Sequence, residues 1–138
     1  MDRWLGCYSE VIYLTVRVVT GLLFACHGSQ KLLNFPAGEP HSSGTLFLCA
    51  AAIELVAGGL IALGLGASYA AFLASGEMAV AYFMVHASKG FFPIQNKGEL
   101  AVIYCFIFLY IASRGSGLLS VDRLIRGKAR AQASVDDR

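Results

Sequence analysis

Four long apolar stretches dominate this chain, and three of them carry a charged side chain near the middle. The internal charges are Arg17, Glu54 and Glu77, and Glu99 opens the fourth stretch. A charge at the centre of a lipid bilayer costs roughly 2.5–3.5 kcal/mol on insertion scales. Such residues usually face the interior of a helix bundle and take part in function, so these four are the first candidates for a site.

The composition is that of a membrane protein. Of the 138 residues, 57% are hydrophobic and only 14% are charged, and the mean hydropathy is +0.62. Soluble domains are nearer half apolar and a quarter charged. The net charge of +2 is too small to indicate nucleic-acid binding. The length suits one membrane domain over residues 1–138.

A transmembrane helix needs about 20 mostly apolar residues. The stretches predict helices at residues 11–33, 45–64, 67–87 and 99–113. The very short connection at residues 64–66 makes the second and third helices antiparallel neighbours. We therefore expect an all-α fold, an up-and-down bundle of four transmembrane helices in the lipid bilayer.

The tail at residues 114–138 is rich in Arg and Lys, which accumulate on the cytoplasmic side of membranes. With four spans, both termini are then expected to be cytoplasmic. Lys31, Lys89 and Lys97 would lie on the outer side and weaken this bias. Within the tail, we expect an amphipathic turn at residues 121–125 followed by a frayed end.

The four cysteines, Cys7, Cys26, Cys49 and Cys105, are scattered through the chain. Their spacing suits neither zinc, an iron–sulfur cluster nor c-type haem. No metal site is predicted. A disulfide between Cys26 and Cys49 stays open, because the two residues could lie at similar depth.

Three charges are expected to meet near the midplane of the membrane. Glu54 and Glu77 lie at the centres of neighbouring helices and so at one depth. Arg17 lies about five residues from the centre of its helix, roughly 7–8 Å away at 1.5 Å per residue, and its long side chain could reach them. One negative charge would then remain, to be neutralised by a proton, another cation or a partner subunit. Alternatively, Arg17 pairs with a carboxylate only to fix the helix register.

A second polar cluster is expected at the outer ends of the helices. Lys31 follows His27 by four residues and shares its helix face, and Tyr82 precedes His86 by the same spacing. Glu99 begins the fourth helix, where the helix dipole favours a carboxylate. The plainer alternatives are histidines bonded to loop carbonyls, lysines that extend to lipid headgroups, and a simple helix start.

Other features favour packing. The aromatic residues of the fourth stretch, including Tyr104 and Phe108, are expected to face lipid or pack between helices. The glycines at 58, 59, 64 and 66 would allow helices to approach closely.

These residues resemble the DoxX family of small bacterial and archaeal membrane proteins, over about residues 17–122. The resemblance rests on the following motifs: His27-Gly28-x-Gln30-Lys31, Glu54-x-x-x-Gly58-Gly59, Gly76-Glu77-Met78-Ala79-Val80-Ala81-Tyr82, His86, Gly90-Phe91-Phe92-Pro93, Asn96, Gly98-Glu99, Arg114-Gly115-x-Gly117 and Ser120-x-Asp122. It implies a four-helix bundle in the cytoplasmic (inner) membrane, associated with redox complexes that pass electrons to quinone. No haem-ligand pattern is evident, and the chain would need a protein partner for a complete reaction.

The first functional hypothesis is therefore a quinone-binding subunit of a redox system. His27, Lys31, His86 and Glu99 would hydrogen-bond the quinone head group, with Tyr82 shaping the pocket. Glu54 and Glu77, offset by Arg17, would handle protons. The alternatives are a non-catalytic scaffold, in which a partner subunit or a second copy neutralises the charge, and a small proton-coupled transporter, which inverted repeats would favour.

Overall fold

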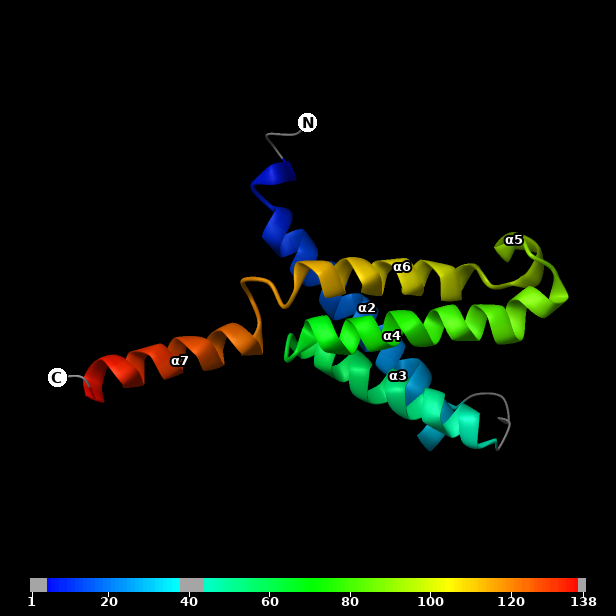
Figure 1. Ribbon diagram of the computed structural model, residues 1–138, viewed down its shortest axis with the longest axis horizontal. Coiled ribbons are helices and arrows are strands. Elements are labelled where there is room, and N and C mark those ends of the chain that lie inside the picture. The colour runs from blue at the N-terminus through cyan, green and yellow to red at the C-terminus, as the bar shows by residue number, and fades with distance from the viewer. Residues whose placement is uncertain (1–4, 38–43, 137–138) are drawn as a thin grey trace.

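The computed structural model describes residues 5–37 and 44–136, with side chains as far as residue 128, and its regular elements are all helices. The long helices are α2 (Ser9–Leu33), α3 (Thr45–Leu63), α4 (Ala67–Ala81), α6 (Glu99–Arg114) and α7 (Val121–Asp136) (Figure 1). The four predicted apolar helices correspond to α2, α3, α4 with its continuation, and α6. The expected all-α fold is confirmed.

Three helical segments among the described residues are long and apolar enough to cross a membrane. They are Ser9–Leu33, Thr45–Leu63 and Ala67–Lys89, the last including the turns that follow α4. The remaining apolar helix, α6, has 16 residues. It is about 24 Å long at 1.5 Å per residue, a little short of the 30 Å hydrocarbon core. It lies alongside α4 (Figure 1).

Helices α2 and α3 pack backbone to backbone because small residues meet at their interface. A Cβ atom added to Gly28 would lie 2.3 Å from the amide nitrogen of Leu55. One added to Gly58 would lie 2.5 Å from that of Ala25. Gly59, also expected to allow close approach, has nothing within 4 Å of such an atom. These contacts fix the register of α2 against α3, as small residues do where membrane helices cross closely.

The tight connection between α3 and α4 is built on glycine. Gly64 ends α3 with a left-handed φ of 71°, and the Leu65 amide donates to the Leu60 carbonyl at 3.0 Å. This backbone pattern closes a helix end, and glycine adopts it without steric cost. Gly66, with φ 57°, precedes α4. The predicted antiparallel neighbours, α3 and α4, pack against each other.

Helix α7 corrects one expectation. The tail was expected to form a turn at residues 121–125 and then fray, but the helix continues to Asp136. It projects away from the bundle (Figure 1). Its start is fixed to the α3–α4 connection, because the Gly66 amide donates to Asp122 Oδ2 at 3.0 Å and the Asp122 amide donates to the Gly64 carbonyl.

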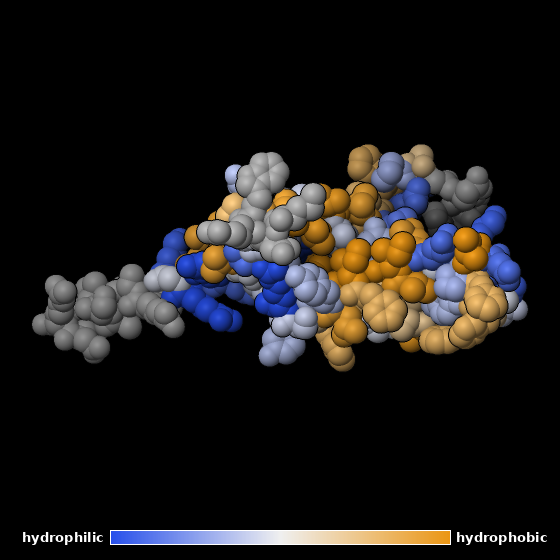
Figure 2. All heavy atoms as spheres, turned by 90° about the horizontal axis from the view of Figure 1, so that it is seen from above, coloured by the Kyte–Doolittle hydropathy of each residue, from blue (hydrophilic) through white to orange (hydrophobic). Residues whose placement is uncertain are grey.

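The outer surface of the bundle is apolar, as a lipid environment requires. Large hydrophobic side chains are exposed on every long helix, including Leu22, Val56, Phe72 and Phe106. Figure 2 shows hydrophobic residues over the middle of the bundle and hydrophilic ones gathered near the base of α7 and towards the opposite end. The structure is thus that of a protein embedded in a bilayer.

Candidate functional site

An ion pair between α2 and α3 lies at the centre of the candidate site. Lys31 Nζ lies 2.5 Å from Glu54 Oε1. The Glu54 side chain is only 4% exposed, whereas that of Lys31 is 25% exposed. Gly28, one turn before Lys31, contacts α3 at Ala51 and Leu55. The close glycine contact therefore places Lys31 at the level of Glu54.

This pair lines a cavity of about 920 Å³ between the helices. The volume falls in the range of small-molecule sites, roughly 300–1,000 Å³, and the walls are mainly apolar, as in such sites. The side chains that can ionise or hydrogen-bond in its lining are His27, Lys31, Cys49, Glu54, Tyr69, Glu77, His86, Lys97 and Tyr104. Five predicted site residues thus meet in one cavity.

Glu77 joins the pair from α4. It is half-buried, it lines the same cavity, and the charges of Glu54 and Lys31 act on it. One oxygen of each carboxylate, Glu54 Oε2 and Glu77 Oε2, is buried with no hydrogen-bond partner among the described residues. Buried polar atoms are normally satisfied, and an unsatisfied one costs about 1–3 kcal/mol. Two acceptor atoms are therefore available to a ligand or to protons.

His86 reaches the cavity from an irregular part of the chain. Helix α4 continues into a π-helical turn, η1 (Tyr82–His86), and a 3₁₀ turn, η2 (Ala87–Lys89). Such π turns often occur at functional sites, because they change the direction of the side chains that follow. The Nδ1 atom of His86 lies 3.1 Å from the Asn96 carbonyl, which can only accept. Nδ1 therefore carries the hydrogen, and Nε2 is left for other partners.

Phe24 of α2 and Tyr104 of α6 form part of the aromatic wall of the cavity, and Phe108 packs against both. Tyr104 and Phe108 are buried, and their rings stack with centroids 5.3 Å apart. Phe24 lies edge-on to Phe108 at 4.7 Å, and His27 lies edge-on to Tyr104 at 6.3 Å. Tyr104 was expected only to pack or face lipid. Its place in the cavity depends on which side of α6 meets α2, which the uniformly apolar α6 sequence does not specify.

Tyr82 is close to the site but has a different role from the one predicted. It does not line the cavity. Its hydroxyl donates to the Phe91 carbonyl, and its ring stacks near that of His86. Buried Asn96 completes this arrangement, with Nδ2 donating to the Gly90 carbonyl at 2.6 Å and Oδ1 accepting from the Gly98 amide at 2.8 Å. These bonds hold the connection between α4 and α6, including α5 (Pro93–Asn96), against the end of α4.

The predicted pairing of Arg17 with Glu54 or Glu77 is wrong. Arg17 is 1% exposed, and its guanidinium donates to the carbonyls of Ile61, Ala62 and Leu119 at 2.8, 3.3 and 2.7 Å. Two of these belong to the last turn of α3, whose carbonyls lack partners within the helix. Ile61 follows Glu54 by seven residues, about 10 Å along the helix. Arg17 therefore lies closer to the end of α3 than to the two carboxylates. The prediction compared the centres of the helices, whereas the glycine contacts set the actual register of α2 against α3.

Glu99 is also separate from the site. Its side chain is exposed at the start of α6 and does not line the cavity. The simple helix-start interpretation fits this position. Lys97, which the sequence reading did not select, lines the cavity instead. It has a left-handed φ of 61° at the end of α5, and this backbone conformation was not evident from the sequence pattern.

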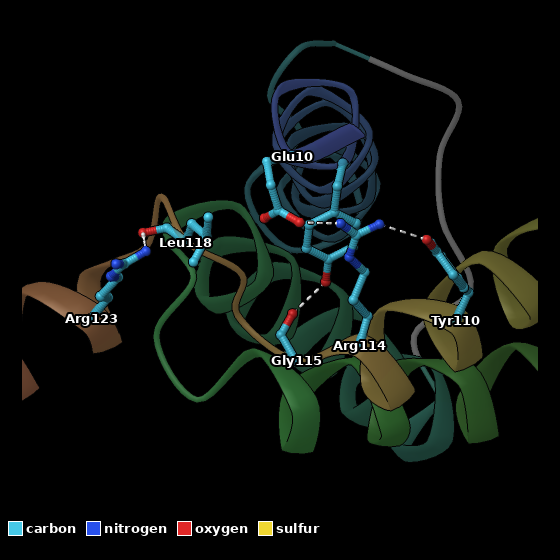
Figure 3. Close-up of polar contacts among 7 residues, drawn as sticks. Glu10, Tyr110, Arg114, Gly115, Leu118 and Arg123 are labelled. Atoms are coloured by element: carbon cyan, nitrogen blue, oxygen red, sulfur yellow. Dashed lines mark hydrogen bonds and ion pairs between the residues drawn. The ribbon is translucent and has the colours of Figure 1, made fainter. Parts of the chain in front are cut away.

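A separate polar cluster closes the other end of the bundle. Arg114, at the end of α6, lies between Glu10 of α2 and Tyr110, and forms an ion pair with the first and a 2.9 Å hydrogen bond with the second (Figure 3). Its guanidinium also lies 4.2 Å from the centroid of the Tyr13 ring, whose hydroxyl donates to the Gly115 carbonyl. These contacts join α2 to α6 and have a structural role.

Within the ranges that the structure describes, no three His, Cys, Asp or Glu side chains are grouped to hold a metal ion. Cys26 and Cys49 form no disulfide. The cavity offers ammonium and imidazole donors, carboxylate acceptors and an aromatic wall. This combination can bind a small amphipathic molecule and exchange protons with it.

The fold and the site define a polytopic α-helical membrane protein with a ligand-sized cavity between its helices. The DoxX family model matches residues 12–87, which include most of α2 and all of α3, α4 and η1. A relative from Haemophilus influenzae, described as an uncharacterized protein, is 43% identical over 122 residues, which is 83% of this chain and 91% of the relative. The chain belongs to the DoxX family. No solved structure matches it.

Proposed function

We propose that this protein is the membrane subunit of a quinone-linked redox system, and that the cavity between α2, α3, α4 and α6 holds the quinone head group. The observation that carries the proposal is the meeting of Lys31, Glu54, Glu77 and His86 in one largely apolar cavity. A quinone combines an apolar ring with two carbonyl oxygens, and its reduction takes up two electrons and two protons. The donor groups of this cavity suit the oxidised quinone, and its acceptor groups suit the reduced quinol.

The residues have distinct parts in this proposal. Lys31 Nζ and the Nε2 atom of His86 donate hydrogen bonds to carbonyl oxygens. The unpartnered atoms Glu54 Oε2 and Glu77 Oε2 accept hydrogen bonds from hydroxyl groups, or hold protons on the way to and from the site. Tyr104 packs against the ring, as aromatic side chains do in ligand sites.

The cavity also bears on the scaffold alternative. If a partner helix neutralised the carboxylates, Glu54 and Glu77 would face a surface that a protein could cover. Both instead line a cavity with His27 and Lys97 at its wall. This arrangement favours a small ligand over a purely architectural role, although electrons must still come from a protein partner.

The proposed orientation has both termini on the cytoplasmic side of the inner membrane. Its support is the basic residues near the base of α7, Arg114, Arg123, Arg126 and Lys128, which lie at one end of the chain's helices. The cavity residues Lys31, His86 and Lys97 then lie towards the outer leaflet.

Quinone binding by the purified full-length protein tests the proposal. Decylubiquinone and a short-chain menaquinone would be titrated in mild detergent, with binding measured by calorimetry. Each would be titrated in its oxidised and its reduced form, and Glu77→Gln should weaken binding of the reduced form at least tenfold, because the amide replaces a carboxylate that accepts a hydrogen bond from the quinol hydroxyl. Glu99→Gln is the matched control, because it removes an exposed carboxylate outside the cavity and should bind as the wild type does. Equal affinity of Glu77→Gln and wild type for both quinones would reject the assigned role.

A further inference from the structure

A second concave surface lies at the other end of the bundle, away from the proposed quinone site. It is a groove of about 850 Å³ between α2, the end of α3 and the start of α7. Its walls are formed largely by leucines: Leu14, Leu63, Leu118, Leu119 and Leu124. Leu63, Leu118 and Leu124 are more than half exposed, so the groove opens towards the surroundings.

The buried guanidinium of Arg17 lines this apolar groove. Its two terminal nitrogens donate to backbone carbonyls, but its Nε atom is buried and has no partner in the described part of the chain. None of its hydrogen bonds goes to a carboxylate. Asp122 acts on Arg17 through its charge, but its carboxylate is bonded to Gly66 and Ser116 instead. A buried cation without a bonded anion is costly, and an anion in the groove would offset that cost.

Two further cations stand at the rim. Arg123 and Lys128 both line the groove and are exposed on α7. Among the described residues, the Arg123 guanidinium makes one long hydrogen bond, of 3.4 Å, to the Leu118 carbonyl. Asp122, the nearby acid, instead bonds with Gly66 and Ser116. The groove therefore combines leucine walls with three positive side chains, and none of the described residues that line it is acidic.

We propose that this groove binds an anionic phospholipid. Arg123 and Lys128 contact the headgroup phosphate, with Arg17 contributing positive charge from below, and the leucine walls contact the acyl chains. Basic pockets between helices bind anionic headgroups in this way, and each Lys or Arg near a membrane surface contributes about 1 kcal/mol. The leucine walls point to a lipid in preference to free phosphate, because a small anion would leave them uncovered.

Bound lipid would stabilise the junction at which α7 leaves the bundle. The groove is formed by residues on both sides of that junction, with Leu14 and Leu63 on the bundle and Leu124 on α7. A ligand that contacts both sides holds them together, so the groove links the lipid composition of the membrane to the position of α7.

Native mass spectrometry of the full-length protein in mild detergent tests the proposal. Phosphatidylglycerol and phosphatidylcholine with identical acyl chains would be titrated in parallel. The wild type should retain phosphatidylglycerol about tenfold more tightly. Arg123→Gln/Lys128→Gln should lose this preference, and these exposed residues can be changed without disturbing the core. Lys89→Gln removes a positive charge at the opposite end, outside both the groove and the quinone cavity, and should keep the preference.

Two further measurements separate the alternatives. Leu124→Ser should weaken the binding of both lipids, since it removes part of the apolar wall. Excess inorganic phosphate should not displace phosphatidylglycerol. Equal retention of the two lipids by the wild type, an unchanged preference in Arg123→Gln/Lys128→Gln, or displacement by phosphate alone would each overturn the proposal. None of these results depends on quinone binding.

Discussion

The ammonium group of Lys31 lies 2.5 Å from Oε1 of Glu54 and joins the end of α2 to the middle of α3. The pair is formed at the wall of the cavity, and the second oxygen of Glu54 has no partner in the described residues. One carboxylate thus has a structural contact on one oxygen and an available acceptor on the other. Under the proposed function, Glu54 would therefore couple the stability of the fold to quinone binding.

Replacement of Lys31 by Met should destabilise the fold by about 3 kcal/mol. This is the lower end of the range for breaking a buried ion pair, because Lys31 is a quarter exposed. The double change Lys31→Met/Glu54→Gln should recover much of the loss, since no buried charge is then left unpaired. Thermal unfolding in detergent, followed by circular dichroism, measures both. A double variant as unstable as the single one would contradict the pairing.

The close contact between α2 and α3 should make the stability of the fold sensitive to one added methyl group at Gly28 or Gly58. Gly28→Ala and Gly58→Ala should each destabilise the protein by about 1–3 kcal/mol, because the new Cβ would lie within 2.5 Å of the neighbouring helix backbone. Gly59→Ala is the matched control, since nothing lies within 4 Å there. Denaturant or thermal unfolding distinguishes them. Equal effects at positions 58 and 59 would contradict the close contact between the two helix backbones at Gly58.

Arg17 should stabilise the junction between α3 and α7, and its replacement should have little effect on quinone affinity. Arg17→Gln removes bonds to Ile61 and Leu119 that join α3 to the segment before α7. Amide hydrogen exchange over residues 118–124 should become at least tenfold faster, as expected when hydrogen bonds from a charged donor, about 1.5–3 kcal/mol each, are lost. Thr15→Ala, an exposed change on the same helix, should leave that exchange rate unaltered. An unchanged exchange rate in Arg17→Gln would show that Arg17 does not stabilise this junction.

The attachment of α7 should weaken in acid. The Ser116 hydroxyl, and then the Gly66 amide, donate to the Asp122 carboxylate and hold its pKa below the usual range. The folded form binds this proton more weakly than the unfolded form, so the contact stabilises the structure above the ordinary carboxyl pKa. That stability is lost as the pH falls through the lowered value.

Hydrogen exchange of the first turn of α7 measures this pH dependence, after correction for the intrinsic exchange rate. Asp122→Asn should give faster exchange near neutral pH and a flatter profile in acid. A wild-type profile that stays flat down to the lowest pH at which the bundle remains folded would disprove the link to Asp122.

Part of the candidate site could be predicted from the sequence. His27, Lys31, Glu54, Glu77 and His86 could be selected because polar side chains are expensive in apolar helices, and the structure brings all five to one cavity. Arg17 was assigned to the wrong partners, and Glu99 and Tyr82 to the wrong surface. Tyr104 and Lys97 were missed because an aromatic in an apolar helix and a lysine in a loop give no distinctive signal.

The sequence by itself determined the class of fold. In an apolar environment each backbone amide must find its partner within its own segment, so long apolar stretches become helices, and glycines at 64 and 66 set the tight connection between α3 and α4. Only the tertiary structure decided which charges meet. The register of α2 against α3 depends on backbone contacts at Gly28 and Gly58, and a shift of one turn, about 5.4 Å, is enough to change which carboxylate or carbonyl a cation reaches.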